Sequence, residues 1–231
     1  MSIEPTFTHP WDLPPAEAQA LQMRLRRRVQ VGPLTGPVRR VAGVDVSVKG
    51  KTGRAAVVLL SFPALDPVEA VTAERPISFP YIPGLLAFRE GPAVLAAFEK
   101  LEGKPDLLIF DAHGLAHPRR MGLATHLGVL VDLPSVGCAK SRLCGEHEEP
   151  PPERGGWVPL LDEGETIGAV LRTRDNVRPV YVSVGHRIDL EGAVEIVLCC
   201  GAGYRLPETT RWAHRVAGGE VPPLAKQPRL L

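Results

Sequence analysis

The apolar residues of this chain follow helical spacing in some segments and a strand-like pattern in others. Between 15 and 30, apolar side chains recur every three or four positions until a Gly-Pro pair ends the pattern. The next three apolar segments, 38–48, 54–62 and 68–74, are short, rich in β-branched residues and separated by glycine or proline. The pattern predicts one helix followed by three strands in an antiparallel meander.

Farther along the chain, predicted helices and strands alternate. The short run 107–110 is apolar throughout, as strands buried on both faces of a sheet are. The segment 146–156 is rich in Pro, Glu and Gly and is expected to be an exposed loop. The remaining patterns predict helices at 85–101, 122–131, 189–200 and 208–216 and strands at 135–139, 165–173 and 180–184.

The order of three strands, helix, strand, helix, strand is the connectivity of the ribonuclease H-like fold. This is an α/β fold in which a mixed β-sheet is flanked by helices on both faces. A chain of 231 residues with 44% hydrophobic content has apolar material for one such core, so we expect a single domain over 1–231. The proline-rich tail, 218–231, is expected to be flexible.

The net charge of +1 argues against a protein whose whole surface grips polyanions, but it leaves local basic patches possible. Two such patches occur in the sequence. The first comprises Arg24, Arg26, Arg27 and Arg28, and we expect it to be the solvated face of a helix. The second comprises Arg119, Arg120, Lys140 and Arg142 and is a candidate contact for nucleic acid.

Cysteine usage and hydropathy bear on the compartment. The four cysteines include the adjacent pair Cys199 and Cys200, which fits a reduced, cytoplasmic setting. Cys138, Cys144 and His147 lack a second ligand pair at zinc-site spacing, so buried apolar cysteines are expected instead. No apolar stretch approaches the ~18 residues of a membrane span, and no secretory signal pattern is visible. We therefore expect a cytoplasmic protein without membrane contact.

Two aspartates stand at unusual places in the apolar pattern. Asp45 interrupts the run 41–46, and Asp111 ends the run 107–110. A carboxylate in a buried strand costs several kcal/mol unless it is paired or bound to metal. Either aspartate alone is explained by capping of a loop, but two on neighbouring strands can share a divalent cation such as Mg²⁺. Glu90 could point to the same site, although the helix dipole also favours acidic residues at a helix start.

The loop Phe79-Pro80-Tyr81-Ile82-Pro83-Gly84 carries an aromatic side chain between two prolines. Such a stiff loop can present Tyr81 as a wedge that inserts between base steps. A rigid turn that packs Tyr81 into the core is the alternative.

The stretch 111–124 follows a predicted strand and opens a predicted helix, so its backbone N–H groups can receive phosphate or base oxygens. Here the sequence resembles the endonuclease V family, and seven fragments in the same order carry the resemblance. They are Gly43-Val44-Asp45, Pro80-Tyr81-Ile82-Pro83-Gly84, Phe88-Arg89-Glu90, Asp111-x-x-Gly114-x-x-His117-Pro118-Arg119, Val136-Gly137-Cys138-Ala139-Lys140-Ser141-Arg142-Leu143, Gly185-His186 and Leu206-Pro207-Glu208-x-Thr210-Arg211-x-x-His214.

This resemblance implies a ribonuclease H-like, monomeric DNA-repair enzyme. Its activity would be Mg²⁺-dependent hydrolysis, with Mn²⁺ as a substitute, of the second phosphodiester bond 3′ to a deaminated purine such as deoxyinosine in DNA. The products would carry 3′-hydroxyl and 5′-phosphate ends. Cleavage of inosine-containing RNA, with which eukaryotic relatives are associated, is the near alternative. A non-catalytic nucleic-acid-binding module on the same fold is a rival, disfavoured because an acidic cluster without metal would repel phosphate.

The resemblance also implies roles for individual residues. Asp45, Glu90 and Asp111 match the family's acidic metal-binding set. Lys140 matches a lysine near the scissile phosphate, and His214 matches a late active-site histidine. A surface lysine and a helix-face histidine are the alternatives for these two. The wedge and the base pocket would be formed by Pro80, Tyr81, Ile82, Gly84, Leu85, Gly114, His117, Gly122 and Leu123.

The resemblance does not decide the role of His117 or the effect of Ala112. His117 either orders its loop through hydrogen bonds or acts directly in catalysis. Ala112 stands where the family usually has glycine. Glycine is favoured where φ is positive or a ligand comes close, so Ala112 is expected to be strained or to displace the loop. On that basis Ala112→Gly would tighten binding of inosine-containing strands.

Overall fold

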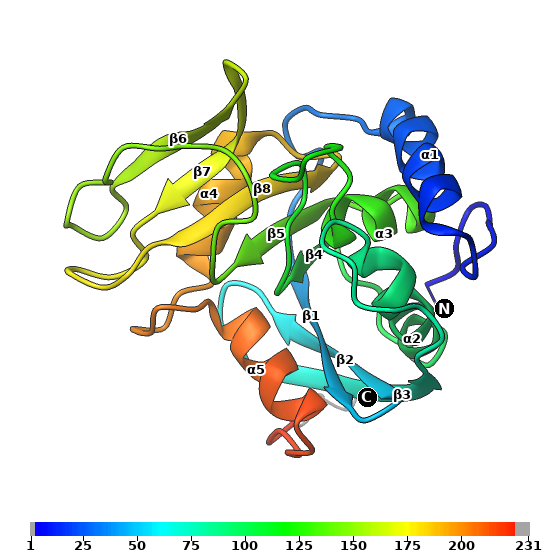
Figure 1. Cartoon of the computed structure of the whole chain (residues 1–231). Coiled ribbons are helices and arrows are strands. Elements are labelled where there is room, and N and C mark those ends of the chain that lie inside the picture. Colours follow the sequence, from blue (N-terminus) through cyan, green and yellow to red (C-terminus); the bar gives the residue numbers. More distant parts are fainter. Residues whose placement is uncertain (1–2, 225–231) are drawn as a thin grey trace.

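A mixed eight-stranded β-sheet runs through the computed structural model, which describes residues 3–224 (Figure 1). The strand order is β3-β2-β1-β4-β5-β8-β7-β6. β1, β4 and β5 are parallel neighbours at the centre, and all other pairs are antiparallel. The strands are β1 (Arg40–Lys49), β2 (Thr52–Ser61), β3 (Pro67–Pro76), β4 (Leu107–Phe110), β5 (Ser135–Ala139), β6 (Trp157–Asp162), β7 (Glu165–Leu171) and β8 (Val180–His186).

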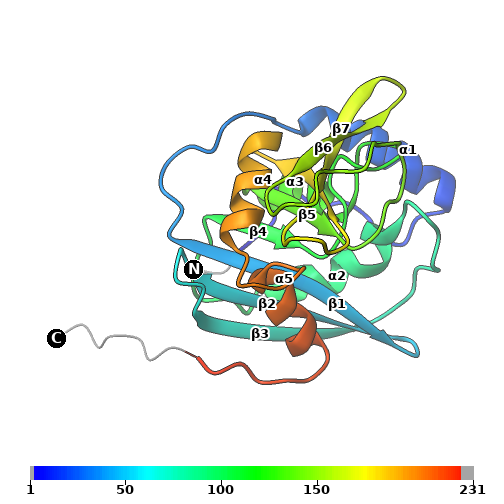
Figure 2. The ribbon, with the colours of Figure 1, turned by 90° about the vertical axis from the view of Figure 1, so that its left-hand side faces the viewer.

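Helices cover both faces of the sheet (Figures 1 and 2). α2 and α3 lie on one face and α4 and α5 on the other. Alternate residues of β1 point to opposite sides of the sheet, so the strand contributes to both helical layers. Val44 packs with the α2 and α3 side, whereas Val41 packs with the α4 and α5 side. The predicted ribonuclease H-like α/β arrangement is confirmed. The helices are α1 (Pro15–Leu25), η1 (Arg26–Arg28), α2 (Leu86–Phe98), α3 (Leu123–Val131), α4 (Leu190–Cys199) and α5 (Glu208–Ala217).

The predicted elements are present, with two main differences. The first helix ends at Leu25 and continues only as a 3₁₀ turn, so it is shorter than predicted. The edge strand β6 was not predicted, because Pro159 interrupts its pattern, and edge strands tolerate proline. Of the tail, 218–224 contains no helix or strand, and 225–231 lies outside the described residues.

α5 lies directly against β1 because Gly43 has no side chain. A Cβ atom at Gly43 would lie 1.9 Å from the carbonyl oxygen of Thr209 in α5. Only glycine allows the two backbones to approach this closely. The contact fixes the position of the rest of α5, including His214, next to β1.

The two basic clusters differ in how far their side chains are exposed. Arg24, Arg26, Arg27 and Arg28 are exposed, as expected for a solvated face. The prediction for Arg120 is wrong. Its buried guanidinium lies 2.8 Å from carboxylate oxygens of both Asp162 and Glu165, so it ties its loop to the β6–β7 hairpin instead of facing a ligand.

The cysteines of the described chain are unpaired. Cys138 is buried as predicted, but Cys144 is only half-buried, so the expectation of burial is wrong for that residue. Among residues 3–224, no helix is long and apolar enough to cross a membrane.

Candidate active site

The central strands bring the two aspartates together. β1 and β4 are parallel neighbours in which Val44 is paired with Phe110, so Asp45 and Asp111 follow at adjacent positions. The N–H of Asp111 donates to the carbonyl of Val44 at 3.0 Å, which continues the pairing by one residue. Ligand atoms of Asp45, Asp111 and His214 all lie within 4.8 Å of one another. This cluster, called the carboxylate cluster below, can hold a metal ion.

Two basic side chains contact the aspartates of the carboxylate cluster. Lys140 directly follows β5, and its Nζ forms an ion pair with Asp111. Nδ1 of His214, from α5, lies 2.8 Å from Oδ2 of Asp45. Neither residue is an isolated surface group, since each contacts one of the two aspartates.

The electrostatics of the cluster favour a cation. Burial raises the pKa of Asp45, the nearby Asp111 raises it further, and the hydrogen bond from His214 opposes both. Burial raises the pKa of Glu90 to about 8, and the charge of Asp45 adds to the effect. Glu90 lies outside the group of ligand atoms within 4.8 Å, yet it is coupled to both aspartates. Like charges held together in this way are stabilised by a divalent cation.

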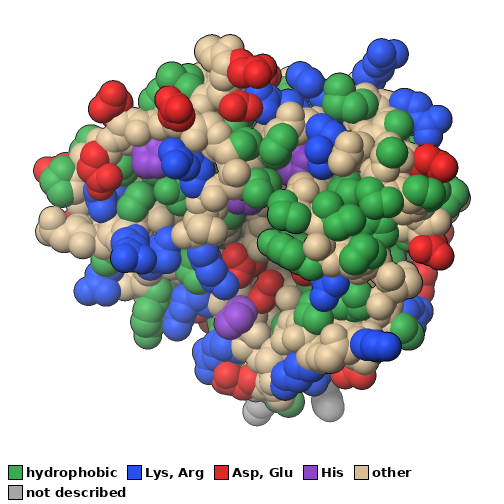
Figure 3. All heavy atoms as spheres, in the orientation of Figure 1, with side chains coloured by type: hydrophobic (Ala, Val, Ile, Leu, Met, Phe, Trp, Pro, Cys, Tyr) green, Lys and Arg blue, Asp and Glu red, His purple; other side chains and the backbone are tan. Residues whose placement is uncertain are grey.

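A pocket of about 310 Å³ opens beside the carboxylate cluster. Asp111 and Lys140 line it, so the cluster and the pocket share a wall. Figure 3 shows acidic side chains in a hollow at the centre of this face, with Lys and Arg on its left and hydrophobic side chains on its right. The volume is at the lower end of the range for small-ligand sites, about 300–1,000 Å³, and suits a ligand the size of a single base.

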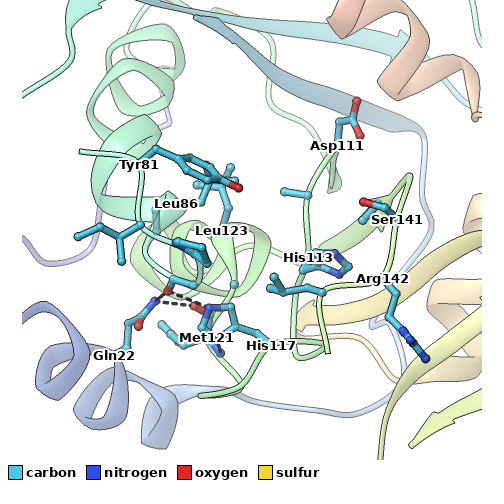
Figure 4. A pocket seen from close by; sticks show the side chains of 18 of the residues that line it. Gln22, Tyr81, Leu86, Asp111, His113, His117, Met121, Leu123, Ser141 and Arg142 are labelled. Carbon is cyan, nitrogen blue, oxygen red and sulfur yellow. Dashed lines mark hydrogen bonds between the residues drawn. The ribbon is translucent and has the colours of Figure 1, made fainter. Parts of the chain in front are cut away.

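The loop before α2 forms one rim of the pocket. Figure 4 shows Tyr81 across the pocket from Asp111 and Ser141. Tyr81 is 70% exposed, so the alternative that it packs into the core is wrong. Phe79 is buried in a core cluster and so fixes the start of the loop. Ile82 lines the pocket, and Pro80 is exposed.

The comparisons with known proteins agree with this geometry. The sequence model of the family described as Endonuclease V matches residues 23–215. The chain belongs to the endonuclease V family. It is 55% identical to the endonuclease V of Roseiflexus sp. strain RS-1 over 95% of this chain and 100% of that protein.

Solved structures lead to the same family. The crystal structure of endonuclease V from Streptomyces avermitilis is 44% identical, with a TM-score of 0.87 over 94% of this chain and 96% of that one. Endonuclease V from Ciona intestinalis, solved in complex with DNA containing an inosine followed by a ribo-adenosine, is 27% identical. Its TM-score is 0.76 over 88% of this chain and 95% of that one. The predicted enzyme class, an endodeoxyribonuclease-type hydrolase, is thereby confirmed.

His117 connects two loops of the chain. Its Nδ1 accepts a hydrogen bond from the N–H of Arg119 at 3.1 Å, so its Nε2 carries the proton and donates to the carbonyl of Gly84 at 2.9 Å. Burial lowers the pKa of His117 to about 4, which keeps the ring neutral. These contacts favour the loop-ordering role over direct catalysis.

Not every predicted pocket residue lines the pocket. Gly84, His117, Gly122 and Leu123 do. The side chain of Leu85 is fully buried in a core cluster with Phe88. Gly114 packs against β8: a Cβ atom there would lie 2.1 Å from the carbonyl oxygen of Val184.

Other lining residues were not predicted from the sequence. His113 lines the pocket, and burial lowers its pKa while the Ser141 backbone and the charge of Asp111 oppose that shift. Gln22 of α1 donates from Nε2 to the carbonyls of Gly84 and Met121, each at 3.0 Å (Figure 4). Further unpredicted lining residues are Pro83, Leu86, Ala87, Ala139 and Leu143.

Ala112 does not have the conformation predicted for it. Among the described residues with positive φ outside glycine, Ala112 is absent, so its backbone is unstrained. It is 5% exposed and belongs to the core cluster that contains Val44 and Phe110, so most of its surface is buried, and the small exposed part lines the pocket. The expectation of strain is therefore wrong.

We accordingly expect Ala112→Gly to lower the free energy of unfolding by roughly 1–2 kcal/mol. The loss combines a more flexible unfolded chain with the lost burial of a methyl group. Preference for inosine should be unchanged. Thermal melts and titrations of inosine-containing and unmodified strands at one salt concentration measure both effects. Tighter lesion binding by the variant would contradict this reading.

Proposed function

We propose that this endonuclease V recognises deoxyinosine and other deaminated purines in DNA and hydrolyses the second phosphodiester bond 3′ to the lesion. The observation that carries the proposal is the wall shared by the pocket and the carboxylate cluster, formed by Asp111 and Lys140. A base turned into the pocket leaves the following phosphates of its strand beside the cluster. The inosine-containing DNA bound by the Ciona enzyme supports this choice of substrate.

The residues of the cluster fit a Mg²⁺ ion, with Mn²⁺ as a substitute. Asp45 and Asp111 offer hard carboxylate oxygens. The pKa of Glu90 is raised chiefly by burial and then by the charge of Asp45, and a cation would offset both effects. When bound, the ion neutralises charge on the phosphate and lowers the pKa of an attacking water. His214 contributes an imidazole already hydrogen-bonded to Asp45. We assign to it an orienting role at that carboxylate.

The side chains around the cluster then have separate tasks. Water attacks phosphorus, the bond from phosphorus to the 3′ oxygen breaks, and that oxygen takes a proton to become a 3′-hydroxyl, leaving a 5′-phosphate. Lys140 stabilises the negative charge that develops on the phosphate. Tyr81 fills the space that the turned-out base leaves in the stack. We further propose that the enzyme acts as a monomer in cytoplasmic DNA repair.

Matched DNA and RNA strands, each with one inosine, test the substrate assignment. We expect Mg²⁺-dependent cleavage of the DNA strand and none of a DNA strand with adenine in place of inosine. Faster cleavage of the RNA strand would favour the ribonuclease alternative. Absence of cleavage of either strand with Mg²⁺ or Mn²⁺ would contradict the proposal.

Tyr81→Ala should weaken discrimination between inosine and adenine about tenfold or more, since the wedge offsets lost stacking worth a few kcal/mol. Because Tyr81 is 70% exposed, the fold should be unaffected. Tyr204, also exposed at 52%, provides a matched control as Tyr204→Ala. The ratio of kcat/KM for the two strands measures the effect. An unchanged ratio would remove Tyr81 from recognition.

A further inference from the structure

The backbone carbonyl of Lys140 is held by an arginine distant in sequence. Lys140 follows the last residue of β5, so its carbonyl lies beyond the strand's pairing. Nη2 of Arg205 donates to this carbonyl at 2.6 Å and to the carbonyl of Pro179 at 2.9 Å. Nε of Arg205 donates to the carbonyl of Arg178 at 3.0 Å. One planar guanidinium therefore satisfies three carbonyl groups.

The partners of Arg205 lie at the ends of two neighbouring strands. β5 and β8 are antiparallel, with Ala139 paired with Tyr181, and Arg178 and Pro179 come just before β8. The guanidinium thus continues the connection between β5 and β8 past their last paired residues. Among residues 3–224, Arg205 has no carboxylate partner within ion-pair distance, so its contacts serve the backbone of this region.

The backbone of Arg205 is also held by a hydrogen bond, and the chain continues from Arg205 to α5. Oγ1 of Thr173, just beyond β7, donates to the carbonyl of Arg205 at 2.5 Å. Two residues after Arg205, Pro207 is the N-cap of α5, the helix that carries His214. Arg205 therefore joins the segment that bears Lys140 to the segment that bears His214.

We propose that Arg205 is a positioning residue for Lys140. The inference rests on the role assigned to Lys140 in the proposed function. A lysine is a point charge on a flexible stem, so its action on a phosphate depends on a backbone that holds still. A displacement of about 1 Å at a reacting group can cost about 10² in rate. Lysine cannot replace Arg205, because an ammonium lacks the planar set of donors.

A double-mutant cycle on cleavage of an inosine-containing DNA strand tests the inference. Arg205→Ala should lower kcat between about 10-fold and 100-fold and leave KM within about twofold. In a Lys140→Ala background, the same change should lower kcat by less than about twofold, because the group it positions is gone. Arg154→Ala is the matched control, since Nη2 of Arg154 also donates to a backbone carbonyl, that of Leu198, at 2.9 Å.

The outcomes separate this inference from the proposed function. Wild-type kcat in Lys140→Ala would overturn the role of Lys140 and the inference together. Suppose instead that Lys140→Ala is slow and that adding Arg205→Ala lowers its kcat by the same factor as in the wild type. That result would overturn the inference alone. An equal loss in Arg154→Ala would also overturn it. If Arg205→Ala does not fold, Arg205→Lys, which keeps the charge but not the planar donors, replaces it in the same cycle.

Discussion

Asp111→Ala abolishes cleavage of inosine-containing DNA, with an expected loss in kcat of roughly 10³-fold, while the DNA remains bound. The same holds for Asp45→Ala. These two carboxylates offer the oxygen atoms that can bind the cation, and these atoms lie within 4.8 Å of each other. Loss of either removes the site for the cation that stabilises the transition state, an effect of the size seen when such electrostatic stabilisation is lost. Binding persists because Tyr81 and the rest of the pocket lining are unchanged, and Asp111 supplies only one part of the wall.

Single-turnover cleavage and anisotropy of a labelled strand separate these two effects. Asp66→Ala is the control, since Asp66 is an exposed aspartate in the β2–β3 turn. It should cleave at the wild-type rate. A wild-type rate in either Asp45→Ala or Asp111→Ala would refute the metal assignment, and loss of binding in parallel with cleavage would place these aspartates in recognition instead.

Glu90→Gln raises the melting temperature of the metal-free protein at pH 8 and changes it little at pH 4.5. The pKa of Glu90 is raised from 4.5 in the unfolded chain to about 8 in the fold, chiefly by burial and then by Asp45. Stability from this group is therefore full below pH 4.5 and is lost as pH rises toward 8, because folding must retain a proton that the unfolded chain releases. Glutamine keeps the neutral form at every pH. The expected gain is on the order of 3 kcal/mol near pH 7.

Thermal melts in EDTA between about pH 4.5 and 9 measure this difference. Glu148→Gln, at an exposed position in the loop after β5, is the control and should follow the wild type. Mg²⁺ should raise the melting temperature of the wild type more at pH 8 than at pH 5, since a cation favours ionised Glu90. Parallel pH profiles for Glu90→Gln and wild type would contradict the electrostatic account of the cluster.

Local patterns predicted most of the fold because the apolar spacing of each segment matched its final environment. The strand 107–110 is apolar throughout, and the structure buries it between two helical layers. β6 was missed because its proline is acceptable only at a sheet edge, and edge position is a property of the whole sheet. The role of Arg120 was misread for a similar reason, since its partners Asp162 and Glu165 lie in a hairpin that includes β6.

A site residue could be predicted from the sequence where it interrupted the apolar pattern of its own segment. Asp45 and Asp111 stood out as carboxylates in apolar runs, whereas Lys140 and His214 were singled out only by resemblance to a family. Gln22 gave no signal, because its contacts with Gly84 and Met121 join segments far apart in sequence.

Mapping the cut in a 5′-labelled DNA strand with one deoxyinosine, in the presence of Mg²⁺, tests the central claim most directly. If the pocket holds the lesion and the carboxylate cluster cuts beside it, one product should appear. That product ends at the second phosphodiester bond 3′ to deoxyinosine, with a 3′-hydroxyl, and EDTA should abolish it. Cuts at scattered positions, or equal cutting of an unmodified strand, would contradict the account.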